Sequence, residues 1–216
     1  MKKKKVQTLI LDFDGTLIDS HLDIAKAANY TLRKMGRPEL AIEQIKGYIG
    51  GGLGPLLKKS LGEENLNLFA EAMPIYRQYY YEHCTDYTTL YPGAREILEH
   101  FRDRDIAMAT NKMFALTMKI LEHFDIARYF KIVLGPDSVQ RRKPHPEAIE
   151  KILTELGNPK ETALMVGDTR FDIEAGKNAG IMTCGVTYGF GSRQEVEECG
   201  ADIIIDGLQE LTLYYE

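Results

Sequence analysis

The chain has 216 residues, 44% of them hydrophobic, with a formal net charge of −5 and an isoelectric point near 5.6. This length is sufficient for one large domain, or for a domain that carries an insertion. The acidic balance argues against a nucleic-acid-binding protein, which would normally present a basic surface. The basic run Lys2–Lys5 is more consistent with a solvated N-terminal end than with a recognition arm.

The sequence contains no signal for membrane insertion or export. No apolar stretch reaches the ~20 residues that a membrane-spanning helix needs, and the apolar segment at residues 6–11 is too short for a signal peptide. Cys84, Cys184 and Cys199 are far apart and form no C-x-x-C pair, which indicates free thiols in a reducing compartment. We therefore expect a cytoplasmic protein that binds neither membrane nor nucleic acid.

The first predicted strand covers residues 6–11, and the stretch that follows contains no convincing strand. Helical patterns cover 20–35, 41–48 and 64–83 instead. Ser20, with Asp23 three residues later, resembles an N-terminal capping box. The stretch of about 65 residues is too long for a plain crossover connection. We expect an inserted α-helical cap domain over residues 19–87, above the carboxyl edge of a sheet.

Strands and helices alternate in the rest of the chain. One-faced helical patterns lie at 94–101, around 114–124 and at 149–156. Apolar runs that predict strands lie at 106–110, 131–135, 163–168, 181–186 and 201–206. This alternation predicts an α/β fold, a doubly wound, Rossmann-like parallel sheet with helices on both faces. Residues 1–18 and 88–216 are expected to form this core domain.

Polar and charged side chains directly follow four of the predicted strands. In chain order these residues are Asp12 and Asp14, then Thr110 and Asn111, then Lys143 in a loop, then Asp168 and Asp172. In an open α/β sheet, ligands bind outside the carboxyl ends of the strands. The joint order of these residues therefore predicts a single site at that edge.

The residue types at this edge suit phosphoryl transfer. Four carboxylates gathered together repel one another, and burial makes the repulsion more costly. A divalent cation with oxygen ligands removes the conflict, and Mg²⁺ suits a site with few carboxylates and several waters. One carboxylate can then act as a nucleophile that forms an aspartyl-phosphate. A cation, a lysine and small hydrogen-bond donors around that acid supply charge neutralisation and in-line positioning.

The segments DFDGT, ATN, KPHP and GDTRFD resemble the four signature motifs of the haloacid dehalogenase (HAD) superfamily of phosphotransferases. The resemblance covers nearly the whole chain, and the helical insertion resembles the small cap of the first type (C1) in that family. It implies a Mg²⁺-dependent phosphomonoester hydrolase that acts on a small phosphorylated metabolite through an aspartyl-phosphate intermediate.

The resemblance implies a role for each residue that handles the phosphoryl group. Asp12 would be the nucleophile that attacks phosphorus. Asp14 would be the general acid that protonates the leaving oxygen, and then the base that activates water. Thr110 and Asn111 would bind phosphoryl oxygens, and Lys143 would neutralise the nucleophile and the transferring group.

The same resemblance implies a metal site. Mg²⁺ would be held by the Asp12 carboxylate, the backbone carbonyl of Asp14 and the Asp168 carboxylate. Asp172 would order metal-bound water or Lys143. Because Asp172 lies where a helix is expected to begin, its charge would also suit a helix N-terminus, and simple capping of that helix is an alternative interpretation.

Two glycine-containing segments are expected to shape the site. By the resemblance, Gly15 and Thr16 form the loop whose amides face the phosphate. The segment GYIGGGL (47–53), together with DFDGTLIDS, most resembles bacterial phosphoglycolate phosphatases. Gly50, Gly51 and Gly52 could form a loop that closes over the substrate, and an ordinary link between helices is the alternative interpretation.

Charged and aromatic residues of the helical insertion provide further candidates for substrate contact. Lys46 and Arg37 are candidates to meet a second anionic group of the substrate. The tyrosines at 79–81 are expected to pack within the cap, with a substrate-facing role as the alternative. Four histidines have no metal-ligand spacing on one helix and are expected to be surface or core residues: His83, His100, His123 and His145.

More than one function is compatible with the four motifs. Asp14 argues against a dehalogenase, which has no leaving alkoxide to protonate, and we favour phosphoglycolate phosphatase. Inorganic pyrophosphatase and a β-phosphoglucomutase-like phosphomutase share the motifs. A receiver-like signalling domain is typically about half this length and has no large insertion. Intact Asp12, Asp14, Lys143 and Asp168 argue against a catalytically inactive binding module. The expected partner is a small-molecule phosphate ester, and the chain could be a monomer or a homodimer.

Overall fold

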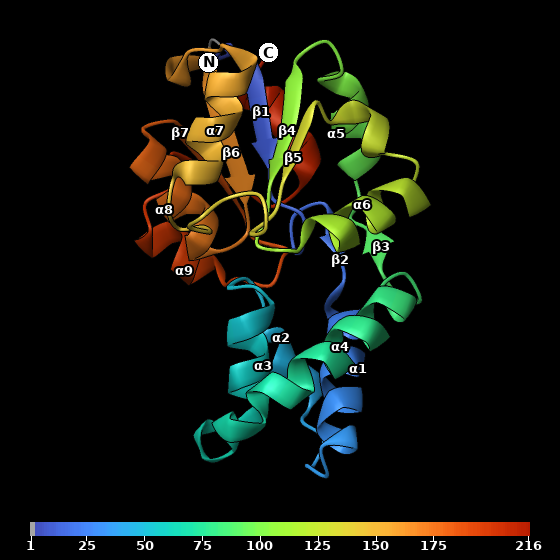
Figure 1. Cartoon of the computed structure of the whole chain (residues 1–216). Helices are drawn as coiled ribbons and strands as arrows, with labels where there is room; N and C mark the ends of the chain where they lie inside the picture. The colour runs from blue at the N-terminus through green and yellow to red at the C-terminus, as the bar shows by residue number, and fades with distance from the viewer. Residues whose placement is uncertain (1–2) are drawn as a thin grey trace.

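The main sheet has six parallel strands in the order β5-β4-β1-β6-β7-β8 (Figure 1). The structure is a computed structural model that describes residues 3–216. The strands are β1 (Thr8–Leu11), β4 (Asp105–Ala109), β5 (Ile132–Leu134), β6 (Ala163–Gly167), β7 (Met182–Val186) and β8 (Ile203–Ile205). All six predicted strands are present. Because the chain winds outward from β1 in both directions, the doubly wound α/β fold is confirmed.

Helices cover both faces of this sheet (Figure 1). They are α5 (Ala94–His100), α6 (Phe114–His123), α7 (Glu147–Leu156), α8 (Arg170–Ala179), α9 (Arg193–Glu198) and α10 (Leu211–Tyr214). Short 3-10 turns lie at Ala127–Tyr129, Lys160–Thr162 and Leu208–Glu210. Gly157 ends α7 in the left-handed conformation, as its position in the sequence predicts.

Alternating side chains of β1 enter two different layers of the core. Leu9 and Leu11 belong to the cluster that includes α5 and α6, whereas Ile10 belongs to the cluster with α7 and α8. Successive side chains of a strand point to opposite faces of the sheet. The strand that carries Asp12 at its end is therefore buried on both sides, as its continuous apolar run indicates.

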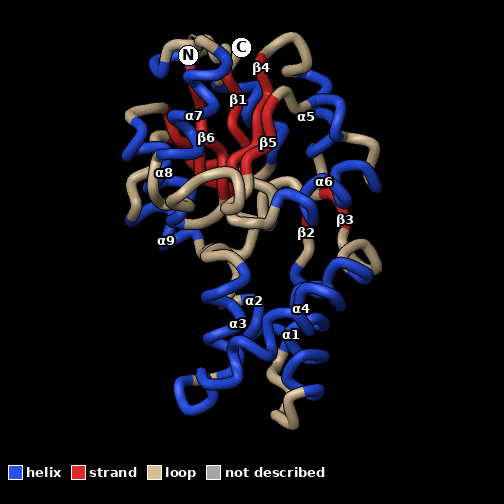
Figure 2. Tube along the Cα trace, viewed as in Figure 1, coloured by secondary structure: helices blue, strands red, loops and turns tan. Residues whose placement is uncertain are grey.

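Four helices form a separate layer beyond the carboxyl edge of the sheet (Figure 2). They are α1 (His21–Lys34), α2 (Ile42–Lys46), α3 (Leu53–Leu61) and α4 (Phe69–His83). We call them the cap helices. Ile24, Ala28 and Leu32 form a buried stripe along α1, and they belong to the same apolar cluster as Tyr76 and Tyr80 of α4. Both chain termini lie at the opposite end of the molecule (Figure 1).

Two details of the cap helices differ from the sequence prediction. Helix α3 was not predicted, because its nine residues are bounded closely by Gly52 and Gly62, both with positive φ, and the flanking glycines obscured the pattern. The predicted helix at 64–83 begins instead as a 3-10 turn, Glu63–Leu68, and becomes α-helical at Phe69. The cap therefore contains four helices where three were expected.

The predicted capping box at Ser20 is wrong. Ser20 makes no side-chain capping bond to α1, and its hydroxyl donates to Asp14 Oδ1 at 2.6 Å. Asp23 accepts hydrogen bonds from the backbone amides of Tyr87 and Thr88 and from the Thr88 hydroxyl. Both side chains bond to residues outside α1. A local sequence motif does not show such contacts.

The two connections between the sheet and the cap helices lie side by side. Strand β2 (Ile18–Asp19) pairs antiparallel with β3 (Thr89–Leu90), and neither short strand was predicted. Asp23 joins the same two connections through its bonds to residues 87 and 88. The predicted domain boundaries, between 18 and 19 and between 87 and 88, fall at this ribbon.

The remaining bulk predictions concern the N-terminus, membranes and cysteines. Lys2 lies outside the described residues, while Lys3, Lys4 and Lys5 are exposed. Within residues 3–216, no helix combines the length and the apolar character that crossing a bilayer requires. All three cysteines are free thiols, as predicted.

Candidate active site

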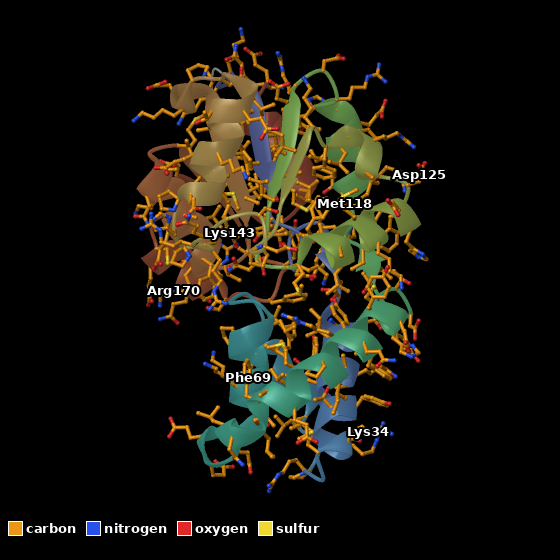
Figure 3. All side chains as sticks on the ribbon, viewed as in Figure 1. Lys34, Phe69, Met118, Asp125, Lys143 and Arg170 are labelled. Carbon is orange, nitrogen blue, oxygen red and sulfur yellow. The ribbon has the colours of Figure 1, made fainter. Side chains whose placement is uncertain are left out.

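The side chains that follow the strands converge at the edge of the sheet that faces the cap helices. Figure 3 labels Lys143 near this edge, with Phe69 and Lys34 in the cap helices beyond it. The buried polar residues gathered there are Asp12, Thr110, Asn111, Lys112, Lys143, Asp168, Thr169 and Asp172. Buried charges lose their hydration, so each needs an opposite charge or hydrogen bonds in its place.

Lys143 links two of the carboxylates. Its Nζ lies 2.8 Å from Asp12 Oδ1 and also contacts Asp172 Oδ1, and the side chain is only 2% exposed. Burial lowers the pKa of Lys143, but the carboxylates of Asp12 and Asp172 outweigh it, so the pKa lies above its usual value. Lys143 therefore carries a positive charge against the predicted nucleophile.

This lysine does not compensate the acids completely. Burial and the charge of Asp172, opposed by Lys143, raise the pKa of Asp12 to about 7. Burial and the charges of Asp172 and Asp12 raise the pKa of Asp168 well above its usual value. Asp12 Oδ1 is fully buried and receives no well-aligned hydrogen bond, so Lys143 provides an ion pair only. Ionising the cluster is costly without a further positive charge.

Asp168 is held by the loop that follows β1 and by the loop that follows β7. Its Oδ1 accepts from the Thr16 hydroxyl at 3.1 Å, and its Oδ2 accepts from the amide of Phe190 at 2.7 Å. Gly15 has a φ of +86°, and a Cβ there would lie 2.2 Å from Asp168 Oδ2. Only glycine fits between the turn and this carboxylate.

The turn at Gly15 and Thr16 uses its own amide groups. The Gly15 amide donates to the carbonyl of Ile18 at 2.9 Å, and the Thr16 amide donates to the carbonyl of Phe13 at 3.2 Å. Both amides therefore bond within the turn, while the Thr16 hydroxyl and the close approach of Gly15 hold Asp168 in place. The role of this loop toward a phosphate stays a prediction.

Asp172 is fully engaged by protein groups. Its Oδ2 accepts from the Thr169 amide at 3.0 Å and from the Thr169 hydroxyl at 2.7 Å, which makes a capping box at the start of α8. Its Oδ1 contacts Lys143. Asp172 therefore caps its helix and orients Lys143 at the same time, so the two interpretations of this residue are compatible.

The chemistry of the donor set fits a hard divalent cation. Asp12, Asp168 and Asp172 each offer a carboxylate oxygen within 4.8 Å of the others. The carboxylates at the site are Asp12, Asp14, Asp168 and Asp172, and the lysines paired with them are Lys112 and Lys143. When all are ionised, two negative charges remain, which one divalent cation with oxygen ligands neutralises. Each of these three carboxylates also contacts protein groups. Asp12 contacts Lys143, Asp168 accepts from Thr16 and Phe190, and Asp172 accepts from Thr169 and contacts Lys143.

Asp14 lies on the side of the site that faces the cap helices. Its carboxylate accepts from Ser20, and Lys112 Nζ lies 3.0 Å from its Oδ1 and 3.2 Å from its Oδ2. The Lys112 side chain is only 4% exposed. Asp12 and Asp14 are therefore paired with different lysines, so each carboxylate of the DFD segment has its own positive charge beside it.

Lys112 was not predicted as a site residue. Lys112 directly follows Asn111 and lies at the same edge of the sheet. Its Nζ donates to Tyr80 Oη and lies 4.6 Å from the centre of that ring. Burial and the nearby Asp14 raise the pKa of Tyr80 well above its usual value, so the phenol keeps its proton.

A pocket of about 550 Å³ of empty space, including its open mouth, lies between the sheet edge and the cap helices. The cap contributes mainly apolar walls, from Ile24, Ile49, Leu53, Leu56 and the two tyrosines Tyr76 and Tyr80. The sheet edge contributes the polar floor, with Asp12, Asp14, Thr110, Asn111 and Lys112. An apolar pocket with a few convergent polar groups is the usual form of a small-molecule site.

Thr110 and Asn111 contact this pocket in different ways. The Thr110 hydroxyl oxygen accepts from the Lys112 amide at 3.2 Å, which leaves its hydrogen free to donate to a ligand. The Asn111 side-chain amide donates to the carbonyls of Gly50 at 2.9 Å and Lys143 at 3.2 Å. Asn111 therefore joins the catalytic edge directly to the cap.

The glycine segment packs closely against the sheet edge. Gly50 and Gly52 line the pocket, while Gly51 lies beside Phe171. A Cβ on Gly52, which has a φ of +85°, would lie 2.9 Å from the Asn111 carbonyl oxygen. The close contact between the glycine segment of the cap and the sheet edge therefore requires glycine at position 52. The predicted closure of this loop over the substrate stays a prediction.

The other candidates for substrate contact lie elsewhere. Lys46 is directed to the Phe190 ring, 5.9 Å from its centre, and Arg37 is exposed, and neither lines the pocket. Tyr79 stacks on Tyr30 at 4.0 Å within the cap, as expected for packing. Tyr80 is also buried in the apolar cluster of the cap, as expected for packing, and in addition it lines the pocket.

Comparison with known proteins agrees with this geometry. The haloacid dehalogenase-like hydrolase family matches residues 9–186. The phosphoglycolate phosphatase of Nitrosospira multiformis is 35% identical over 214 residues, which cover 96% of this chain and 94% of that protein. That of Aquifex aeolicus is 37% identical over 187 residues, 86% of each chain. A crystal structure of a protein from Haemophilus somnus 129PT, described as a predicted phosphoglycolate phosphatase, superposes with a TM-score of 0.91 at 26% identity, covering 97% of this chain and 98% of that one.

The chain therefore belongs to the haloacid dehalogenase-like hydrolases, the family to which its four motifs point. Within this family it is a phosphatase. The relatives match it over nearly their whole length, so the similarity includes the cap helices as well as the sheet.

Proposed function

We propose that the chain is a Mg²⁺-dependent phosphatase that hydrolyses 2-phosphoglycolate through an aspartyl-phosphate on Asp12. The observation that carries the proposal is the position of Asp12, which lines the pocket together with Asp14 and is paired with the buried Lys143. The names of the relatives support phosphoglycolate in particular. The proposal includes the division of the chain into a core, residues 1–18 and 88–216, and a cap, residues 19–87.

In the first step, Asp12 attacks phosphorus while the bond between phosphorus and the ester oxygen breaks. Asp14 gives its proton to the leaving oxygen, so the alcohol leaves neutral. Lys143 offsets negative charge at the nucleophile, and the Thr110 hydroxyl is placed to donate to a phosphoryl oxygen.

In the second step, Asp14 takes a proton from a water molecule as that water attacks the phosphorus of the aspartyl-phosphate. The bond between phosphorus and the Asp12 oxygen breaks, inorganic phosphate leaves, and both carboxylates return to their starting state. Asp14 is suited to both steps because Ser20 and Lys112 fix its carboxylate on the side of the pocket where the leaving group lies.

The acid cluster supports a magnesium requirement. Asp12, Asp168 and the Asp14 backbone carbonyl would hold Mg²⁺, which would supply charge neutralisation for the phosphoryl oxygens. Asp172 would order Lys143 or metal-bound water, and its contact with Lys143 supports this role.

The apolar cap walls favour an organic leaving group over inorganic pyrophosphate. A pyrophosphate leaving group is itself a multiply charged phosphate, and Lys112 is the only cationic side chain among the described residues that line the pocket. A small carboxylate needs less compensation, which favours phosphoglycolate.

The test measures phosphate release from 2-phosphoglycolate and from a generic aryl phosphate, with Mg²⁺ and with a chelator. We expect Asp12→Asn to lose about 10³-fold or more of kcat on both substrates, because the nucleophile is removed. The matched control is Asp103→Asn, an exposed aspartate to which the described residues make no hydrogen bond or ion pair, and it should keep the wild-type rate. Equal activity of Asp12→Asn and wild type would contradict the covalent mechanism.

A further inference from the structure

We propose that Lys112 and Tyr80 form a specificity site for a carboxylate on the leaving group of the substrate. The proposal deepens the proposed function and rests on it, because it concerns the same pocket and requires phosphoryl transfer at Asp12. It assigns substrate choice to a lysine of the sheet edge and a tyrosine of α4, in place of the lysine and arginine of the cap that the sequence suggested.

The first step of the argument is position. Lys112 lies two residues after Thr110 in the chain, and both line the pocket together with Asp12 and Asp14. Its Nζ is 3.0 Å from Asp14 Oδ1, so it lies beside the group that protonates the leaving oxygen. In 2-phosphoglycolate only one carbon separates the ester oxygen from the carboxyl carbon. A carboxylate on the leaving group therefore falls within reach of Lys112 when Asp14 contacts the ester oxygen.

The second step is charge. The cap walls of the pocket are apolar, and among the described residues that line the pocket Lys112 is the only cation. A carboxylate moved into such surroundings loses its hydration and needs an ionic hydrogen-bond partner. Lys112 is the residue that can provide one. Lys143, the other buried lysine, does not line the pocket.

The third step is the hydrogen-bond capacity of Tyr80. Its Oη accepts from Lys112 Nζ, and the described residues provide no acceptor for its own hydrogen. Burial keeps the phenol protonated. Tyr80 can therefore donate to one carboxylate oxygen while the ammonium group beside it binds the other. A neutral hydroxyl in the same place would gain no ionic hydrogen bond.

The test compares 2-phosphoglycolate with 2-hydroxyethyl phosphate, in which a hydroxymethyl group replaces the carboxylate. The quantity measured is the ratio of the two kcat/KM values, with Mg²⁺ at saturating concentration. We expect Lys112→Met to lower this ratio roughly 10- to 100-fold. Because Lys112 also pairs with Asp14, kcat should fall on both esters, and the ratio isolates the loss that is specific to the carboxylate. Tyr80→Phe, which removes one oxygen, should lower the ratio in the same direction by a smaller factor.

The matched control is Lys119→Met. Lys119 lies on α6, and its Nζ contacts the Tyr81 carbonyl without lining the pocket. Its replacement should leave the ratio unchanged. Inhibition by glycolate gives an independent readout that needs no turnover of a slow variant, and it should weaken in Lys112→Met but persist in Lys119→Met. Tyr80→Phe keeps the test decisive if Lys112→Met does not fold.

The outcomes separate this inference from the proposed function. A ratio that stays unchanged in Tyr80→Phe and in folded Lys112→Met, while wild type hydrolyses 2-phosphoglycolate, overturns the inference and leaves the function standing. A wild-type enzyme that shows no preference for 2-phosphoglycolate over 2-hydroxyethyl phosphate also overturns it. Failure of wild type to release phosphate from either ester or from an aryl phosphate contradicts the proposed function itself.

Discussion

At the scale of single residues, the site is a set of charges that only partly compensate one another. Lys143 neutralises Asp12 and Asp172 in part, yet the pKa of Asp12 still rises to about 7 through burial and the charge of Asp172. The pKa of Asp168 also rises, for the same kind of reason. The metal-free protein therefore holds protons that a bound divalent cation would displace.

This residual charge predicts how stability depends on pH. Because the pKa of Asp12 is about 7 in the folded chain and 3.8 in the unfolded one, folding takes up a proton between those limits. The stabilisation is complete below about pH 4 and is lost as the pH rises through 7, amounting to on the order of a few kcal/mol at most. Added Mg²⁺ should stabilise increasingly over the same window, since proton competition falls.

Thermal unfolding between pH 5.5 and 8, with chelator or with Mg²⁺, measures this effect. Asp12→Asn removes the titrating group, so its metal-free Tm should fall less with pH than that of wild type. The variant should also gain less from Mg²⁺. A wild-type increment from Mg²⁺ that shrinks as the pH rises from 5.5 to 8 would contradict the assignment, and Asp103→Asn serves as the control that should follow wild type.

At the scale of elements, the strand ends were predictable and the cap contacts were not. The residues after β1, β4 and β6 were found from the sequence because parallel strands bring their carboxyl ends to one edge whatever the details of packing. Lys112 was missed because its role depends on Tyr80, which comes from a distant helix. The prediction of a capping box at Ser20 was wrong because the Ser20 hydroxyl donates to Asp14, which lies outside the helix.

The approach of the glycine segment to the sheet edge leads to a second prediction. Gly52 has a φ of +85°, and a Cβ there would lie 2.9 Å from the Asn111 carbonyl oxygen. Gly52→Ala should therefore push the cap segment away from Asn111 and weaken the Asn111–Gly50 hydrogen bond. We expect kcat/KM to fall about 10-fold, with backbone strain of roughly 1–3 kcal/mol as the cause, because this positive-φ, extended conformation is open essentially to glycine alone.

Gly54→Ala is the matched control, measured with the same steady-state assay. Gly54 lies in the first turn of α3, and nothing lies within 4 Å of the position of its Cβ. Alanine favours the helix there by roughly 0.5–1 kcal/mol, so this variant should be as active as wild type and slightly more stable. Similar kinetics for both alanine variants would show that the approach of Gly52 to Asn111 does not matter for turnover.

At the scale of the whole molecule, the pocket depends on how the cap helices are placed relative to the sheet, because both line it. The sheet and the cap helices are joined by the β2–β3 ribbon and by the bonds of Asp23 to residues 87 and 88. The sequence predicted the insertion and its place in the chain. The contacts between the two connections were not predicted. A two-residue strand has too short a pattern to recognise, and Asp23 lies 64 residues from Tyr87 in the chain.

The hydrogen bonds of Asp23 to residues 87 and 88 lead to a prediction for the molecule as a whole. Asp23 is 1% exposed, and its carboxylate accepts from the Tyr87 amide, the Thr88 amide and the Thr88 hydroxyl. Asp23→Ala would leave these donors without their acceptor, which should cost about 2–4 kcal/mol in the free energy of unfolding. Because the bonds lie between the layers, the variant should also exchange amide hydrogens faster at residues 87–90 than elsewhere in the sheet.

Denaturant unfolding and hydrogen exchange, followed by steady-state kinetics, measure the three consequences. Asp86→Ala is the matched control, because Asp86 lies in the same connection but pairs only with His83 at the surface, a contact that contributes at most about 1 kcal/mol. We expect a higher KM in Asp23→Ala, since a cap that is less firmly joined presents Tyr80 to the substrate less often. If Asp23→Ala lost stability without any change in exchange at residues 87–90 or in KM, then Asp23 would stabilise α1 alone, and the alignment of the two layers would rest on the β2–β3 ribbon and on the Asn111–Gly50 hydrogen bond.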